Sequence, residues 1–493
     1  MHSNSTKPKS NMQKTLDSVH CFQEDALGKY DAVGLREKLK KGAISIEALT
    51  QAAQKRAQLV DPSINAITFN RPTHPKFNNR KNTAFFYGVP TFVKDNIAIK
   101  HLPTGFGSAA IQPKIETKHS YYAQQFLSSG VNVLGKSSLP EFGFNATTEP
   151  AHKAATRNPW NLAYSSGASS GGSAALVATG VVPFAHGNDG GGSIRIPAAC
   201  CGLVGLKPSR GRHINEFASR ALPINIVSEG ILSRTVRDTA YFHHEIQKHY
   251  RNKNLPALPL ITSPNKTRLK IGVFTDAVTG FSTDQDTRFA VLKTAQILEE
   301  AGHHVDEMRF PVNAQFAEDF SLYWGMLSFL VKQSGKFTFS TNFTPSAMDE
   351  LSHGLAKHYR KNLHKTPQFL YRLKQAAHQF TTQFESYDAY LSPVLAQTTR
   401  PLGELHPSTN FYELLERLTR YAGFTPMANV AGTPAISLPA GLSRKGLPIG
   451  IQLASAIGQE QTLLELAYEL EEIQPWPHLF DLLSSDPGRG RNE

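Results

Sequence analysis

Cysteine is scarce in this sequence of 493 residues: there are three, and two of them, Cys200 and Cys201, are adjacent. So few cysteines cannot form a disulfide framework, which excludes a small disulfide-stapled domain and favours a reducing, cytoplasmic location. Long apolar runs are missing too, since no segment approaches the ~20 residues of a membrane-spanning helix. Residues 1–11 are polar and carry lysines, without the apolar stretch of a signal peptide. We therefore expect no membrane segment.

Spaced pairs of metal ligands are also absent. Three cysteines without a spaced pair do not predict a structural zinc site. His244 and His249 are five positions apart, roughly 140° around a helix, whereas the zinc motif H-E-x-x-H needs a spacing of four. We interpret the segment 243–249 as a solvated helix end, and we expect neither a metal nor another cofactor.

The formal net charge is +12, from 52 lysines and arginines against 40 acidic residues. The basic residues are scattered, and their denser groups fall in apparent linkers at 249–253 and 357–365. A basic stripe interleaved with aromatic side chains, which is typical of a nucleic-acid-binding surface, is not present. Nucleic acid is therefore not expected as the primary ligand.

Predicted strands and helices alternate along the chain, which favours an α/β fold. Apolar residues recur with helical spacing at 31–40 and at 46–59, where Ser45 stands at the N-cap position. Short apolar runs predict strands. The predicted strands lie at 64–69, 131–135, 181–185, 269–274, 434–439 and 448–453, and further helices are predicted at 174–180, 289–300 and 461–471.

The length is compatible with about three domains or with one large α/β domain. We predict one domain over residues 29–480. It contains a polar, basic linker or insertion at 245–268 and an irregular, helix-rich region at 310–420. Residues 1–28 and 481–493 are predicted to be flexible tails.

A glycine- and serine-rich loop at 164–173 leads directly into a segment of good helix formers. A phosphate-binding P-loop needs a lysine after the last glycine, and Ser173 stands there instead. Residues 167–171 also match the G-x-S-x-G nucleophile elbow, with Ser169 as the attacking hydroxyl. That motif requires a buried strand before the loop, and residues 158–164 are poor strand formers.

A second glycine-rich segment carries three consecutive glycines, Gly190, Gly191 and Gly192, followed by Ser193. Backbone N–H groups that side chains do not shield can converge on one point. A hydroxyl beside such donors suits acyl transfer, because the donors stabilise the oxyanion that forms when the hydroxyl attacks a carbonyl. The alternative is a tight turn with a buried, hydrogen-bonded serine.

A serine nucleophile needs a base, and the sequence places no histidine beside Ser193. Most of the lysines stand in polar company, whereas apolar residues precede and follow Lys94. Strand periodicity puts it on the same face as Phe92. A lysine removed from water has a lowered pKa and can act as a base. The alternative is a lysine at a strand end whose amine reaches water.

Together these segments resemble the amidase signature family, whose members use a Ser-Ser-Lys triad. The resemblance is carried by motifs at 88–96, 158–161, 167–173, 187–197, 202–208 and 429–437. It covers about residues 30–240 and 420–475, and the form of the segment 187–197 is most similar to bacterial amidases related to a nylon-oligomer cyclic-dimer hydrolase. It implies a mixed central β-sheet covered by helices on both faces.

The resemblance also implies residue roles. Ser193 would form an acyl-enzyme, and Ser169, held by a cis peptide bond, would bridge Ser193 to the base Lys94. The N–H groups of Gly190, Gly191, Gly192 and Ser193 would form the oxyanion hole. Asp189 and Arg195 would hold the loop in place. The implied reaction is hydrolysis of a small-molecule carboxylic amide to an acid and an amine or ammonia.

Alternatives remain open at this point. The chain could be an amidotransferase A-type subunit that acts on glutamine in a complex, an α/β-hydrolase esterase with Ser169 as nucleophile, or an inactive binding protein. A homodimer is compatible with the sequence. The helix-rich region 310–420, here called the variable region, contains three candidates for the substrate pocket: Trp324, Phe329 and Phe337. Their alternative role is packing in the core.

Overall fold

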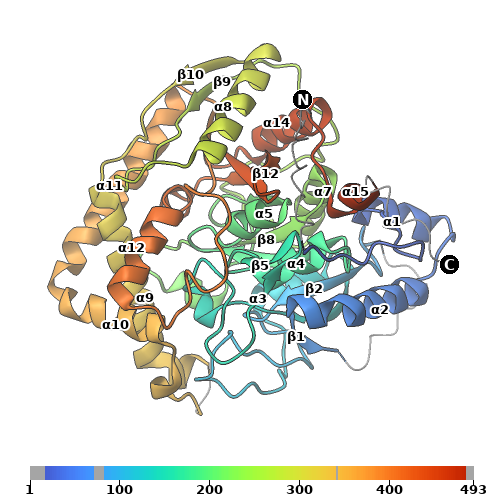
Figure 1. Cartoon of the computed structure of the whole chain (residues 1–493), viewed down its shortest axis with the longest axis horizontal. Coiled ribbons are helices and arrows are strands. Elements are labelled where there is room, and N and C mark those ends of the chain that lie inside the picture. Colours follow the sequence, from blue (N-terminus) through green and yellow to red (C-terminus); the bar gives the residue numbers. More distant parts are fainter. Residues whose placement is uncertain (1–16, 72–82, 340–341, 485–493) are drawn as a thin grey trace, which may run out of the picture.

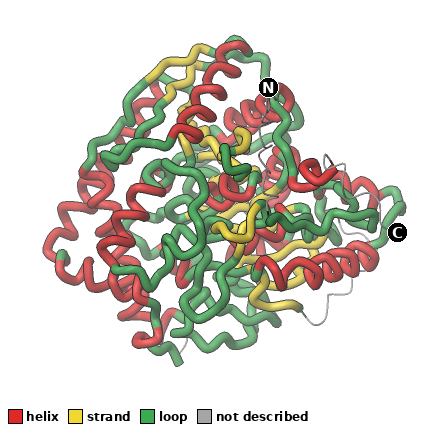
Figure 2. The backbone as a smooth tube through the Cα atoms, viewed as in Figure 1, coloured by secondary structure: helices red, strands yellow, loops and turns green. Residues whose placement is uncertain are grey.

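The computed structural model describes residues 17–71, 83–339 and 342–484. An eight-stranded sheet runs through the centre, with helices around most of its strands (Figure 2). Its strand order is β10-β9-β11-β13-β12-β7-β8-β6. The strand bounds are β6 (Phe184–Asp189), β7 (Val204–Lys207), β8 (Ser228–Ser233), β9 (Lys270–Val273), β10 (His304–Glu307), β11 (Ala389–Pro393), β12 (Ala435–Leu442) and β13 (Pro448–Ser455).

The sheet is mixed, which confirms the predicted fold class. Strand β9 is parallel to β10 and to β11, whereas the other neighbouring strands are antiparallel. The middle strands are buried on both faces, as expected when helices cover both sides.

A smaller sheet has the order β1-β3-β2. Its strands are β1 (Ile67–Asn70), β2 (Pro90–Lys94) and β3 (Asn132–Ser137). Strand β2 lies beside β6, because the Thr91 hydroxyl donates a hydrogen bond to the carbonyl of Phe184 at 3.0 Å. The strand that ends at Lys94 is thereby attached to the strand that leads into the triple-glycine loop.

Helices cover the large sheet on both faces. On one face, β-sheet side chains pack against α7 (Val236–Ile246), α8 (Gln285–Glu300) and α14 (Glu460–Ile473) in a single hydrophobic cluster. The other face carries α5 (Arg195–Cys201), with α4 (Gly171–Ala178) beside it in a second cluster. Helix α4 comes directly after Ser169 and helix α5 directly after Ser193, so each serine-bearing loop is connected to a helix that packs in the core.

A group of helices from the variable region lies along one side of the molecule, at the left in Figure 1. It consists of α9 (Gln315–Thr338), α10 (Glu350–Lys361), α11 (Thr366–Thr382) and α12 (Phe411–Tyr421). Its aromatic residues pack into a third cluster together with α13 (Pro426–Ala431). The remaining α-helices are α1 (Ala32–Lys40), α2 (Ile46–Ile64), α3 (Tyr121–Leu127), α6 (Phe217–Arg220) and α15 (Leu479–Ser484).

Several local predictions are confirmed. Ser45 caps α2, since its Oγ accepts a hydrogen bond from the N–H of Ala48 at 3.0 Å. The helix continues beyond its predicted end, through Pro62 to Ile64.

No helix in the described part of the chain is long and apolar enough to cross a membrane.

Other predictions differ from the structure. Cys21 and Leu27 are buried in the core, so residues 17–28 are packed rather than a loose tail. Residues 1–16 and 485–493 of the predicted tails lie outside the described residues. Residues 161–165 form strand β5 despite poor strand propensity, pairing with β4 (Arg157–Asn158). This short strand is mostly accessible to solvent, unlike the buried strand that a nucleophile elbow requires.

The prediction of a solvated helix end at 243–249 is wrong for its first residue, His243. His243 faces inward from α7 and is fully buried. Its Nδ1 lies 2.8 Å from Nε2 of His213, and the two rings stack with centroids 5.0 Å apart. Neighbouring histidines can therefore occupy opposite environments, because successive positions on a helix face different directions.

Candidate active site

Lys94 ends strand β2 with its side chain fully buried. Its Nζ lies 2.8 Å from Oγ of Ser169 and donates to Oδ1 of Asn188 at 2.6 Å. None of the salt bridges among the described residues includes this lysine. Burial lowers the pKa of Lys94 to about 7, although Glu229 and Asp189 act in the opposite direction. An amine in this state can accept a proton near neutral pH, and it does not extend to water.

Ser169 stands just before α4, and the peptide bond between Ala168 and Ser169 is cis. The two serine-bearing loops meet here, because the N–H of Ser170 donates to the carbonyl of Ser193 at 3.2 Å. Among the described hydrogen bonds, none joins Oγ of Ser169 to Oγ of Ser193. The Lys94–Ser169 contact is therefore already formed, whereas the contact between the two hydroxyls is not.

The loop that carries Ser193 is folded around the carboxylate of Asp189. This carboxylate accepts the N–H groups of Gly192 at 2.8 Å and Ile194 at 3.1 Å, and it pairs with the guanidinium of Arg195 at 2.8 Å. Burial alone would raise the pKa of Asp189, but the Arg195 charge and its hydrogen bonds hold that pKa well below its usual range. Asp189 is thus a permanent anion that shapes the loop.

The amides of the loop divide into two kinds. Within the described residues, the N–H groups of Gly190, Gly191 and Ser193 donate to no protein acceptor. The N–H of Gly192 is different, because it is bound to Asp189. The structure therefore departs from the expectation that Gly192 contributes an oxyanion donor, and leaves the other three amides available.

Helix α5, which begins just after Ser193, sits unusually close to the sheet. A Cβ at Gly205 of β7 would lie 2.7 Å from Cβ of Ala198, and one at Gly450 of β13 would lie 2.5 Å from Cβ of Ala199. Only glycine leaves room for the helix at this distance. Two strands thus fix the depth at which the serine loop lies.

Three polar side chains near Lys94 escaped the sequence reasoning. Asn188 and Glu229 stand directly opposite each other on β6 and β8, and His186 lies on the same face two residues before Asn188. His186 Nε2 donates to Glu229 at 3.0 Å, and Asn188 also hydrogen-bonds this carboxyl group. Burial raises the pKa of Glu229 to about 8, against the effect of Lys94. Glu229, the one charged residue in the segment 228–233, was the one available signal.

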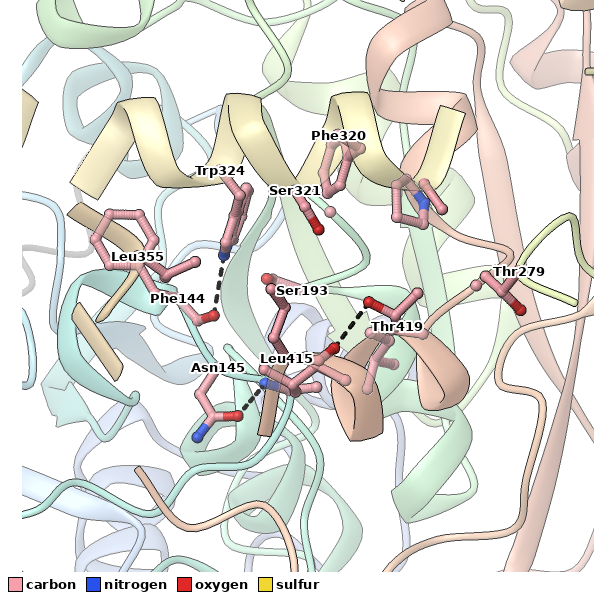
Figure 3. Close-up of a pocket in the computed structure, with 18 of the residues that line it drawn as sticks. Phe144, Asn145, Ser193, Thr279, Phe320, Ser321, Trp324, Leu355, Leu415 and Thr419 are labelled. Carbon is pink, nitrogen blue, oxygen red and sulfur yellow. Dashed lines mark hydrogen bonds between the residues drawn. The ribbon is translucent and has the colours of Figure 1, made fainter. Parts of the chain in front are cut away.

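A pocket opens onto Ser193, and Figure 3 shows it lying between α9 above and α12 below. Trp324 lines this pocket, as one of the candidate aromatics was expected to do. The other two candidates do not: Phe329 packs against Tyr359, and Phe337 is 94% exposed. Ser193 and Gly191 contribute to the pocket wall, whereas Ser169 lies behind it.

A buried lysine, two serine hydroxyls and unpaired backbone amides next to a pocket are the kinds of group that nucleophilic acyl transfer requires. A family model described as Amidase matches residues 48–464. The chain belongs to the amidase family. It is a hydrolase that acts on carbon–nitrogen bonds other than peptide bonds.

Relatives of this amidase agree along nearly their whole length. It is 45% identical over 468 residues to a putative amidase, AmiC, of Mycobacterium tuberculosis, covering 94% of this chain and 98% of that protein. It is 32% identical over 477 residues to the 6-aminohexanoate-cyclic-dimer hydrolase of Paenarthrobacter ureafaciens, covering 90% and 95%. A solved structure of a 6-aminohexanoate cyclic dimer hydrolase superposes with a TM-score of 0.80 at 30% identity, covering 92% and 98%.

These likenesses bear on the alternatives. The A subunit of a glutamyl-tRNA(Gln) amidotransferase from Clostridium botulinum is more distant, at 28% identity. The family assignment replaces the α/β-hydrolase interpretation. In the described part of this amidase, no group of three or more histidines, cysteines or acidic residues could hold a metal ion.

Proposed function

We propose that this amidase cleaves its substrate through an acyl-enzyme on Ser193, with Lys94 as the base and Ser169 as the proton bridge. The observation that carries the proposal is the buried Lys94 amine, 2.8 Å from the Ser169 hydroxyl and without a carboxylate partner in the described chain. An unpaired charge there would be costly, so the amine is neutral at rest and ready to accept a proton.

Acylation begins when Ser193 Oγ attacks the amide carbonyl carbon. The Ser193 proton moves to Ser169 Oγ while the Ser169 proton moves to Lys94 Nζ. The free N–H groups of Gly190, Gly191 and Ser193 stabilise the oxyanion. Protonated Lys94 then returns a proton through Ser169 to the amide nitrogen, the C–N bond breaks, and the amine leaves.

Deacylation repeats the sequence with water. Lys94 takes a proton from water by way of Ser169, and the hydroxide attacks the ester carbonyl. When the tetrahedral intermediate collapses, Ser193 recovers its proton from the same relay and the acid leaves. Because the Ser169 and Ser193 hydroxyls are not yet bonded, one side-chain rotation has to complete the relay, as is common before substrate binds.

The choice of Ser193 over Ser169 as nucleophile rests on access. Ser193 lines the pocket and is 8% exposed, whereas Ser169 does not line it and is 3% exposed. A fluorophosphonate probe followed by peptide mapping tests this choice. We expect the adduct on Ser193, loss of both labelling and amide hydrolysis in Ser193→Ala, and retained labelling in Ser321→Ala, a pocket serine outside the relay. An adduct on Ser169 would refute the proposal.

A further inference from the structure

The pocket next to Ser193 differs from the rest of the site in containing no charge. Its cavity volume is about 110 Å³, and it has an open mouth through which a substituent can enter. Among the residues that line it, none is aspartate, glutamate, lysine, arginine or histidine. The buried charges of the site, such as Asp189 and Arg195, lie behind the serine loop and do not line the pocket.

Three polar side chains in the pocket wall are already bound to the protein. Thr419 donates to the carbonyl of Leu415 at 2.8 Å, and the Trp324 indole donates to the carbonyl of Phe144 at 3.0 Å (Figure 3). The Asn145 amide donates to the carbonyl of Leu405 at 2.8 Å. The side-chain groups that remain for a ligand are the neutral hydroxyls of Ser193, Thr279 and Ser321, and Thr279 Oγ1 is buried without a partner among the described residues.

One wall is a stack of aromatic rings along α9. Phe316, Phe320 and Trp324 recur at intervals of four residues, and their successive ring centroids are 6.1 and 5.5 Å apart with small interplanar angles. Phe144 meets Trp324 edge-on at 5.7 Å. Helix α12 supplies Leu415 opposite this wall. The two sides form an apolar slot that suits a ring or an alkyl chain.

We infer that this amidase acts on uncharged amides that carry an aryl or alkyl group, and that it rejects amides with an ammonium or carboxylate on that group. The inference rests on the proposed role of Ser193, because the slot opens onto that side chain. A charged group placed there would lose its hydration without gaining a partner. Glutamine, with both charges, is excluded as an efficient substrate for the same reason.

The sharpest test compares hexanamide with 6-aminohexanamide, which differ by one terminal ammonium. We expect kcat/KM to be about 100-fold higher for hexanamide, since burying an unpaired ion costs several kcal/mol. Glutamine should be hydrolysed no faster than 6-aminohexanamide. Equal rates for the matched pair in a Ser193-dependent reaction would overturn the inference but leave the proposed function standing. Hydrolysis that survives Ser193→Ala would instead overturn the proposed function.

A variant pair separates charge from shape. Ser321 lines the slot from α9 and takes no part in the proton relay. Ser321→Asp should lower the ratio of kcat/KM for hexanamide to kcat/KM for 6-aminohexanamide at least about tenfold, because the new carboxylate can pair with the ammonium. Ser321→Asn, of similar size and without charge, should leave the preference unchanged. An equal effect of both variants would argue against the inference.

A second measurement does not depend on amide turnover. A hexyl fluorophosphonate and its 6-aminohexyl counterpart both modify the nucleophile directly. We expect the neutral probe to inactivate the wild type about 100-fold faster, and Ser321→Asp to reduce that ratio. Equal inactivation rates would overturn the inference even if neither hexanoyl amide were a good substrate.

Discussion

Lys94 Nζ donates a hydrogen bond to the Asn188 side chain at 2.6 Å, and this side chain in turn contacts the carboxyl group of Glu229. Asn188 thus holds the amine in place without stabilising its charged form as strongly as a carboxylate in direct contact would. The amine keeps its position while its pKa stays low. A base that must release its proton after each step needs this arrangement.

The first prediction concerns the pH dependence of kcat/KM for a neutral amide. The pKa of Lys94 is lowered by burial to about 7, so the amine is charged and unable to accept a proton below that pH. Activity should therefore rise with pH, about tenfold per unit on the acid side, and level off above about pH 7. A flat profile from about pH 5 to 9 would contradict the role of Lys94 as base.

A second prediction concerns Glu229. Because burial raises the pKa of Glu229 to about 8, the residue is protonated over much of the working range. Glu229→Gln should keep activity within roughly tenfold, the cost of one imperfect hydrogen bond. It should also leave the midpoint of the pH profile close to its wild-type position, because a carboxyl group that is already protonated near pH 7 carries no charge for the substitution to remove.

Glu229→Ala is the matched comparison for that experiment. It leaves Asn188 and His186 without their shared partner, so urea unfolding should show a loss of about 1–3 kcal/mol. An inactive but stable Glu229→Gln enzyme would mean that the ionised carboxylate is needed.

Asp189 provides the third prediction. Asp189→Asn removes the counter-charge of the fully buried Arg195, so the free energy of unfolding should fall by about 3–5 kcal/mol. Asp286→Asn breaks a pair with the largely exposed Arg444 and should cost less than about 1 kcal/mol. Urea unfolding of both variants checks the contrast, and similar losses would mean that Asp189 does not hold the loop by charge.

The triple glycine supplies a fourth prediction. Gly192 has a φ of 129°, and a Cβ there would lie 2.7 Å from Cδ1 of Ile196. Gly192→Ala should therefore destabilise the protein by about 1–3 kcal/mol and slow fluorophosphonate labelling of Ser193. At Gly190 the nearest heavy atom would be 3.7 Å from the new Cβ, so Gly190→Ala should change the melting temperature little. Equal melting temperatures for Gly192→Ala and Gly190→Ala would mean that a side chain at position 192 is tolerated as well as one at position 190.

Much of the site follows from short segments of sequence. Lys94, Ser169 and Ser193 stand in motifs whose residue types already indicate their chemistry, and the structure brings Lys94 and Ser169 into contact. The flanking strand and helix of each motif are also local features, set by apolar spacing and capping. These parts could be predicted because each depends on residues that are neighbours in the chain.

The rest depends on pairing between distant segments. Asn188 and Glu229 meet only because β6 and β8 align in one particular register, which neither strand specifies alone. His243 is buried because His213 arrives from another part of the chain. The occupied amide of Gly192 likewise reflects how the loop wraps around Asp189 rather than its composition. Such relations require the tertiary structure.

The close seating of α5 on Gly205 and Gly450 has a consequence for interpreting variants of this enzyme. Both glycines lie in strands packed against α5 and do not line the pocket, yet an added methyl group would displace this helix, which follows the proposed nucleophile Ser193. A substitution at either position would abolish turnover while leaving every reacting group intact. In a mutational survey, these two sites would be mistaken for participants in the chemistry.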